Sequence, residues 1–113
     1  MNMFSWMLVG HMIGDFLLQT GWMAKKTSNA TSLLTHCLVY TMTIYIVALP
    51  AGGLSAPALI VIFVSHLVLD QRKFVLFWVR RVNNADSLPW MSIVIDQSFH
   101  LLVLGLTAQY LVK

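Results

Sequence analysis

The sequence gathers its imidazoles and carboxylates inside its most apolar stretches. All four histidines and three of the four acidic residues lie within runs of hydrophobic side chains, and there is no glutamate. An aspartate at the centre of a membrane helix costs about 2.5–3.5 kcal/mol, so three would cost on the order of 10 kcal/mol unless they are paired, protonated or bound to a cation. One candidate set therefore comprises His11, Asp15, His36, His66, Asp70, Asp96 and His100.

The spacing within this set is helical. Six members form pairs four residues apart, which places both side chains of a pair on one helix face. The pairs are His11 with Asp15, His66 with Asp70, and Asp96 with His100, and Gln19 extends the first by four more residues. Mixed His and Asp ligands suit zinc, iron or manganese, and helical bundles build metal sites from such pairs. We expect a divalent transition metal, with zinc first and iron or manganese as alternatives.

The number of candidates exceeds one tetrahedral site. Seven residues are available where four ligands suffice. Either two ions bind, or some members orient the ligands or act in catalysis. The carboxylates that could serve as a general base are Asp15, Asp70 and Asp96.

Four apolar segments must position these residues. The chain has 113 residues, of which only 10% are charged, whereas soluble domains average about 25%. This composition predicts an all-α protein, a single integral membrane domain over residues 1–113 with spans at about 3–20, 32–49, 56–71 and 89–111. The first and third spans are short, so flanking residues or a thinner bilayer must compensate. Short connections predict a transmembrane four-helix bundle with antiparallel neighbours.

Basic residues indicate which connections face the cytoplasm. They are Lys25 and Lys26 in the first connection and Arg72, Lys73, Arg80 and Arg81 in the third, while the second has none. We therefore expect a multi-pass protein with both termini outside the cytoplasm. Residues 72–82 either continue the third helix or, as we favour, form a separate interfacial helix on anionic headgroups after a bend near the first basic pair.

This orientation brings the candidate residues to similar depths. With a rise of about 1.5 Å per residue, Asp15, His36, Asp70 and Asp96 all lie within roughly 10 Å of the cytoplasmic ends of their helices. In the third pair, Asp96 and His100, the Asp precedes the His in the sequence, but the helix crosses the membrane in the opposite direction. In every pair the Asp is thus nearer the cytoplasm and the His nearer the membrane centre, which predicts one polar cage in the cytoplasmic half of the bundle.

Several of these motifs also carry a resemblance. They are His-Met-Ile-Gly-Asp-Phe-Leu-Leu-Gln at 11–19, Trp-Met-Ala-Lys at 22–25, His36, Ser-His-x-x-x-Asp at 65–70 and Asp-Gln-x-x-His at 96–100. Over nearly its whole length the chain resembles a family of small bacterial and phage membrane proteins, domain-of-unknown-function family 3307. The resemblance implies a multi-helix protein of the bacterial inner membrane and no particular activity. A looser likeness to membrane-bound metal-dependent hydrolases is an analogy of residue types.

Two classes of function fit these observations. The first is an intramembrane metal-binding protein. Such a protein could act as a metal-dependent hydrolase of an amphiphilic substrate at the inner headgroup level, because a bound ion lowers the pKa of a water molecule and a non-ligating carboxylate can accept its proton. The second is a non-enzymatic ion- or proton-handling protein or an accessory subunit of a larger membrane complex, in which the polar residues serve either as a relay or, through a His, as a ligand to haem or a chlorin. The expected partners are the lipid bilayer and either a second copy or a larger membrane complex, with no nucleic acid.

Overall fold

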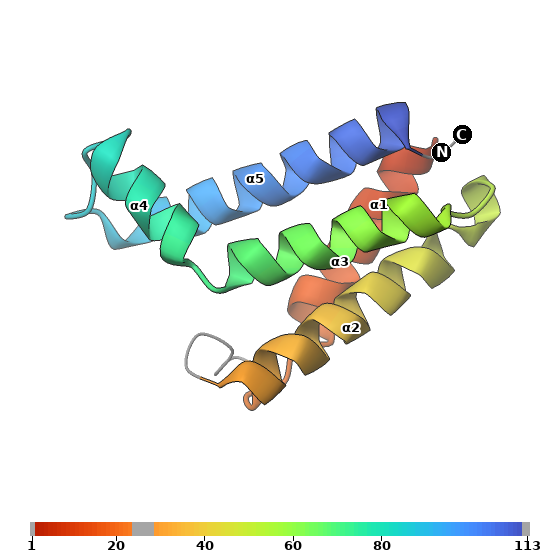
Figure 1. Cartoon of the computed structure of the whole chain (residues 1–113), viewed down its shortest axis with the longest axis horizontal. Coiled ribbons are helices and arrows are strands. Elements are labelled where there is room, and N and C mark those ends of the chain that lie inside the picture. The colour runs from red at the N-terminus through yellow and green to blue at the C-terminus, as the bar shows by residue number, and fades with distance from the viewer. Residues whose placement is uncertain (1, 24–28, 112–113) are drawn as a thin grey trace.

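Five α-helices make up most of the computed structural model, which describes residues 2–23 and 29–111 (Figure 1). They are α1 (Met3–Met12), α2 (Ala30–Val47), α3 (Ala56–Asp70), α4 (Lys73–Arg81) and α5 (Pro89–Tyr110). A π-helical turn, η1 (Ile13–Leu17), extends α1, and a 3-10 turn, η3 (Leu49–Ala51), follows α2. No strand occurs among the described residues, which confirms the predicted all-α class.

Capping side chains and turn residues determine where the helices begin and end. The Asn29 side chain accepts the backbone N–H groups of two residues in the first turn of α2, and Ser55 caps α3, which has Pro57 in its first turn. Between α2 and α3, Gly52 and Gly53 have φ values of 111° and 83°, a region that favours glycine. The chain therefore reverses direction sharply here.

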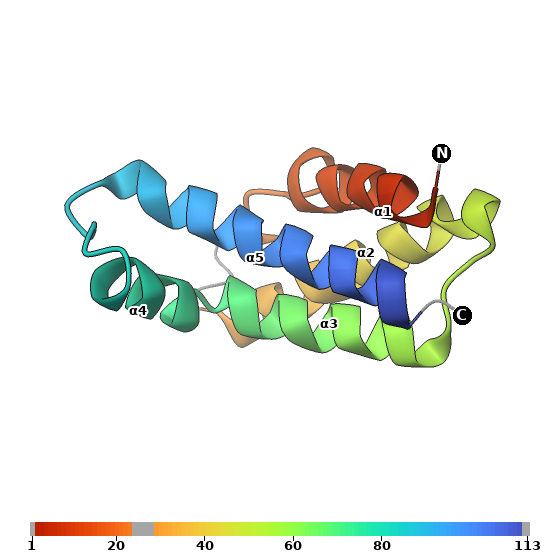
Figure 2. The same ribbon diagram turned by 90° about the horizontal axis from the view of Figure 1, so that it is seen from above.

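Four helices form a ring in which each contacts two neighbours. The contacting pairs are α1 with α2, α2 with α3, α3 with α5, and α5 with α1. Consecutive members run in opposite directions, and the views in Figures 1 and 2 agree that α3 and α5 lie side by side. Apolar side chains from all four fill the centre of the ring, namely Met7, Tyr40, Ile44, Ala48, Ile62 and Leu104.

Two glycines bring α1 and η1 very close to α2. A Cβ atom at Gly10 would lie 3.0 Å from the Ile44 Cα, and one at Gly14 would lie 3.2 Å from the Tyr40 Cα. Real Cβ atoms rarely have such short contacts. Any larger residue would therefore push the two helices apart, next to Asp15.

The π turn changes the end of the first predicted helix. We expected Gln19 on the same helical face as His11 and Asp15, but the helix leaves α geometry at Ile13 and ends at Leu17, so that expectation is wrong for Gln19. The Leu18 N–H donates to the Ile13 carbonyl at 2.9 Å, five residues back. This wider turn lets Gly14 stay against α2 while the Asp15 side chain faces the bundle interior.

The segment after α3 bends and begins a separate helix, which was the favoured expectation. Arg72 adopts a left-handed conformation with φ of 67°, and α4 starts at the next residue. Val75 and Val79 on α4 are buried in a cluster with Leu69 and Ala85, against which the first half of α5 packs. Figure 1 shows α4 at the end of the molecule opposite the chain termini.

Two of the helices are long and apolar enough to cross a membrane. By length and composition these are α2, with 18 residues, and α5, with 22 residues. The segments Met3–Leu17 and Ala56–Asp70 are apolar but shorter. Fifteen residues of α3 extend about 22 Å, whereas a hydrocarbon core is about 30 Å thick.

Candidate metal centre

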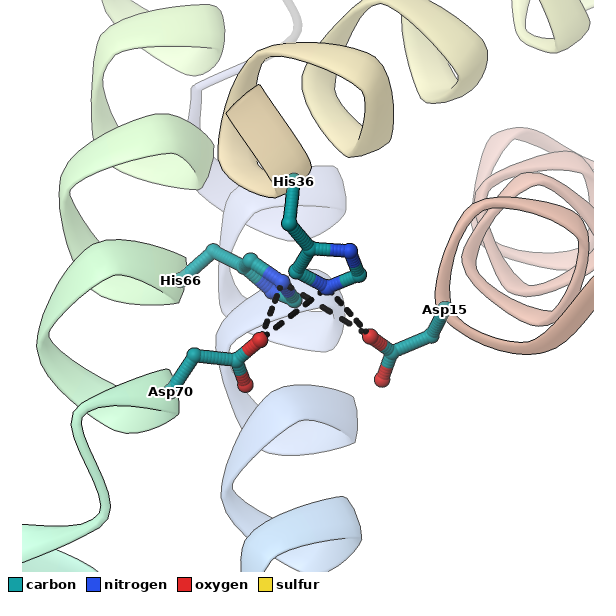
Figure 3. Close-up of side chains that lie close together, drawn as sticks. All are labelled: Asp15, His36, His66 and Asp70. Atoms are coloured by element: carbon teal, nitrogen blue, oxygen red, sulfur yellow. Dashed lines mark hydrogen bonds and ion pairs between the residues drawn. The ribbon is translucent and has the colours of Figure 1, made fainter. Parts of the chain in front are cut away.

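Four side chains from three neighbouring segments converge near the middle of the bundle. Figure 3 shows Asp15 approaching from η1, His36 from α2, and His66 and Asp70 from α3. The most exposed of the four, Asp15, is only 5% exposed. The four-residue spacing within α3 brings His66 and Asp70 to the same face, as predicted. We call these four residues the metal cluster.

Distances within the metal cluster are close to those of a tetrahedral ion site. The His36 Nε2 lies 3.0 Å from both Asp15 Oδ1 and Asp70 Oδ2. The His66 Nε2 lies 3.0 Å from Asp70 Oδ2 and 3.7 Å from Asp15 Oδ1. Zinc bonds of about 2.0–2.2 Å place neighbouring ligand atoms about 3.3–3.6 Å apart in a tetrahedron. Three of the four nitrogen–oxygen separations are hydrogen-bond distances about 0.3 Å shorter than this, and the fourth is slightly longer, so an ion would need to spread the ligands by a few tenths of an ångström.

A hydrogen bond beside the metal cluster couples the protonation of His66 to that of His100. The His100 Nδ1 lies 2.7 Å from the backbone oxygen of Asp96, which can only accept, so this nitrogen carries a proton. In a neutral His100, Nε2 is then an acceptor, and its partner 2.9 Å away, the His66 Nδ1, must donate. A neutral His66 consequently directs the lone pair of its Nε2 at the carboxylates of the metal cluster. Such an arrangement is repulsive unless a cation lies between them.

His100 and Asp96 form a second group with Asp70. The His100 Nε2 is 3.4 Å from Asp70 Oδ1, and its Nδ1 is 3.6 Å from Asp96 Oδ1. Together they are a possible second set of ligands. Both nitrogens of His100 already have hydrogen-bond partners, however, so its present role is to hold His66 in position.

His11 lies outside both groups, one layer further into the bundle. The carbonyl oxygen of the Gln97 amide can only accept, so the His11 Nε2 donates to it at 2.8 Å. The His11 Nδ1 then accepts from the Tyr40 hydroxyl at 2.7 Å. The Gln97 amide nitrogen donates to Asp15 Oδ2 at 3.3 Å and to Asp96 Oδ2 at 3.4 Å. His11 therefore supports the metal cluster through Gln97.

Tyr40 is a member of the site that sequence reasoning missed. Its ring stacks on His66, with centroids 3.7 Å apart and planes 14° from parallel. It is 1% exposed and follows His36 by four residues on α2. That spacing was the available signal, since it puts the phenol on the same helix face as His36.

A pocket of about 220 Å³ opens beside the metal cluster. Its polar lining comes from Asp15, Gln19, Arg72, Asp96 and Gln97. Phe16 and Ile93 complete the wall, and both are at least half exposed at the surface of the bundle. The pocket thus connects the Asp15 carboxylate with the outside of the protein between η1 and α5.

Arg72, whose positive charge helped to predict the orientation in the membrane, also lies beside this site. Its Nη1 is 4.0 Å from Asp96 Oδ2, an ion pair without a direct hydrogen bond. Among the residues that the structure describes, with neutral imidazoles, the carboxylates of Asp15, Asp70 and Asp96 and this one guanidinium sum to a charge of −2. Buried charge is normally compensated. A single divalent cation would neutralise the whole arrangement.

The seven residues predicted from sequence thus occupy three positions in the site. Four form the metal cluster, two lie in the group that shares Asp70, and His11 lies in the supporting layer. All seven are buried in the bundle.

Comparison with known proteins identifies the family of this chain. No curated protein and no solved structure matches it significantly. The family model described as "Protein of unknown function (DUF3307)" matches residues 3–113, which is nearly the whole chain. The chain therefore belongs to the DUF3307 family, as its motifs indicated.

Proposed function

We propose that this chain is an intramembrane metal protein that binds one divalent transition metal ion, with zinc as the first candidate, through Asp15, His36, His66 and Asp70. The observation that carries the proposal is the orientation of His66. When His100 is neutral, the His66 Nδ1 donates to it, so a neutral His66 presents a lone pair to carboxylate oxygens 3.0 and 3.7 Å away. A cation at the centre converts this repulsion into coordination.

The charge of the site supports a single ion. One divalent cation brings three carboxylates and one guanidinium to neutrality, whereas two would leave an excess of +2 in a buried site. Protonation of His66, or of His100 so that its Nε2 donates to the His66 Nδ1, would satisfy the same contacts with one charge instead of two. Metal analysis separates these alternatives directly.

The membrane placement is also a proposal. In it, α1 with η1, α2, α3 and α5 cross the bacterial inner membrane, and the metal cluster lies in the cytoplasmic half. Three features support it: the length of α2 and α5, the many large apolar side chains exposed on the bundle, and the position of both termini at one end. The basic helix α4 lies at the other end, where cytoplasmic headgroups would be.

The pocket beside the metal cluster supports a hydrolytic role. When bound, the ion would act as a Lewis acid and activate a water molecule. Asp15 and Asp70 serve as ligands, which leaves Asp96 as the general base in the pocket wall. Asp96 would accept the proton of the attacking water and return it to the leaving oxygen as the ester bond breaks.

Metal stoichiometry tests the binding proposal. Protein purified in detergent and reconstituted with zinc should contain about one ion per chain by elemental analysis. His36→Asn and His66→Asn should lose it, whereas His11→Asn, which removes an equally buried imidazole outside the metal cluster, should retain it. Circular dichroism checks that each variant is folded. Absence of stoichiometric zinc, iron or manganese from the folded wild type contradicts the proposal.

Turnover tests the hydrolase separately. Zinc-loaded protein should cleave a short-chain ester or phosphoester amphiphile, and Asp96→Asn should abolish cleavage while retaining its zinc. Unchanged cleavage by Asp96→Asn would exclude Asp96 as the base. Metal binding without any turnover would refute the hydrolase and leave the metal site intact.

A further inference from the structure

Arg72 adopts a left-handed backbone conformation at the bend between α3 and α4. Arg72 and Asn84 are the two non-glycine residues with positive φ in the described parts of the chain, at 67° and 51°. This conformation disfavours residues with a Cβ, although asparagine tolerates it well. Asn84 lies in an exposed loop, whereas Arg72 comes two residues after the ligand Asp70. Strained residues at such positions frequently have a functional reason.

The left-handed turn directs Arg72 toward the pocket instead of toward solvent. The other basic residues of this region, Lys73, Arg80 and Arg81, are exposed. The Arg72 side chain is only 26% exposed and reaches to within 4.0 Å of Asp96 across the α3–α5 contact. A guanidinium has five N–H donors, and this ion pair is too long to be a hydrogen bond. Its donors are therefore available to a ligand in the pocket.

The remaining walls fit an amphiphile with a compact polar head. Amide groups of Gln19 and Gln97 share the pocket with Arg72. Phe16 and Ile93 line its outer part and are 50% and 57% exposed, on the side that would face acyl chains. Guanidinium groups bind phosphate oxygens in a bidentate geometry that ammonium groups do not match.

We propose that this pocket binds the phosphate group of a phosphoester, with Arg72 as its specificity-determining residue. The inference deepens the proposed function and rests on it, because it names the substrate class of the same site. Without a metal ion, the carboxylates around the pocket leave a charge of −2 and repel an anion. With one divalent ion the site is neutral and accepts it. Phosphate binding should therefore depend on metal loading, and phosphate should in turn strengthen zinc binding.

The test compares two arginine variants of the full chain in detergent. Arg72→Asn removes the guanidinium but keeps a residue that tolerates the left-handed turn, and Arg81→Asn removes the same charge from an exposed position on α4. The probes are inorganic phosphate, dioctanoyl phosphatidylglycerol and dioctanoylglycerol, titrated calorimetrically into zinc-loaded and zinc-free protein. Zinc content is measured in every sample.

We expect phosphatidylglycerol to bind zinc-loaded wild type, and Arg72→Asn to weaken that binding about tenfold or more at unchanged zinc content, because a charge-assisted contact is lost. Arg81→Asn should bind as wild type does. Binding of both phosphate probes assigns the site to the phosphate group itself, and binding of the lipid alone assigns it to a lipid headgroup. Equal losses in the two variants, equal binding of dioctanoylglycerol, or binding independent of zinc would overturn the inference. Absence of zinc from the wild type refutes the proposed function instead.

Discussion

Substitution of Gly14 by alanine should damage the metal cluster without touching a ligand. A Cβ atom at this position would lie 3.2 Å from both the Cα and the Cδ2 of Tyr40. The first of these is a backbone atom, so it cannot move without α2. Carbon atoms pack best at about 3.5–4.0 Å, so η1 must move away from α2 by roughly 0.3–0.8 Å.

That displacement exceeds what the coordination geometry allows. Ligand distances in metal sites hold to within about 0.2 Å. Asp15 adjoins Gly14 and is the proposed ligand that comes from η1, while the other three proposed ligands come from α2 and α3. Gly14→Ala should therefore pull away one ligand of four and weaken zinc binding by about 10–100-fold, as outer-shell changes in metal sites do.

The assay is competition for zinc with a chromophoric chelator, in detergent, for Gly14→Ala and for Gly105→Ala. The control also introduces alanine into a helix, but its Cβ would meet only the Phe4 Cε1 at an ordinary 3.8 Å. We expect the control to match wild type. Wild-type affinity in a folded Gly14→Ala protein would refute the reasoning, because Asp15 would then not depend on the close approach of η1 and α2.

Three other predictions follow from the contacts of the site. Asp70→Asn should abolish stoichiometric zinc binding in elemental analysis, because the lost oxygen lies 3.0 Å from the Nε2 of both His36 and His66, and retained zinc would exclude Asp70 as a ligand. Gln97→Ala should keep one zinc per chain but weaken it by about tenfold in chelator competition, since Gln97 orients Asp15; unchanged affinity would contradict that role. Zinc at 100 times its dissociation constant should stabilise the fold by about 2.7 kcal/mol, seen as a chelator-reversible rise in Tm, and a Tm that ignores zinc would contradict binding to the folded state.

The convergence of His and Asp could be predicted because it rests on two strong physical constraints. Helical spacing places His66 above Asp70 and Asp96 above His100, and the cost of isolated carboxylates in an apolar segment requires that they meet. Spacing and charge therefore predicted which side chains meet in the interior of the bundle. The antiparallel order of the helices followed from the short connections in the same way.

The layering within the site depends on packing that no single segment encodes. The π turn at Ile13–Leu17 arises where Gly14 meets Tyr40, and it removes Gln19 from the helical face that a regular helix predicts. His11 has the same spacing to Asp15 as His66 has to Asp70, yet its nitrogens are engaged by Gln97 and Tyr40. The four-residue spacing alone cannot distinguish a histidine of the metal cluster from one that only positions its neighbours.

Arg72 shows a second limit of sequence reasoning. A basic residue at the end of an apolar helix indicates topology, and Arg72 is indistinguishable from Lys73 by that criterion. Its left-handed backbone conformation and its ion pair with Asp96 appear only in the folded chain, where α4 packs against α5. Only the structure could assign Arg72 to the pocket.

X-ray absorption at the zinc edge of the reconstituted protein tests the central claim most directly, because it reports the ligands of the ion itself. We predict one zinc per chain with nitrogen and oxygen neighbours only, at about 2.0–2.2 Å, including the outer-shell scattering of two imidazoles. A sulfur neighbour at about 2.3 Å would assign the ion to Cys37, the one cysteine of the chain, and contradict the metal cluster. Folded protein that retains no stoichiometric metal would contradict it equally.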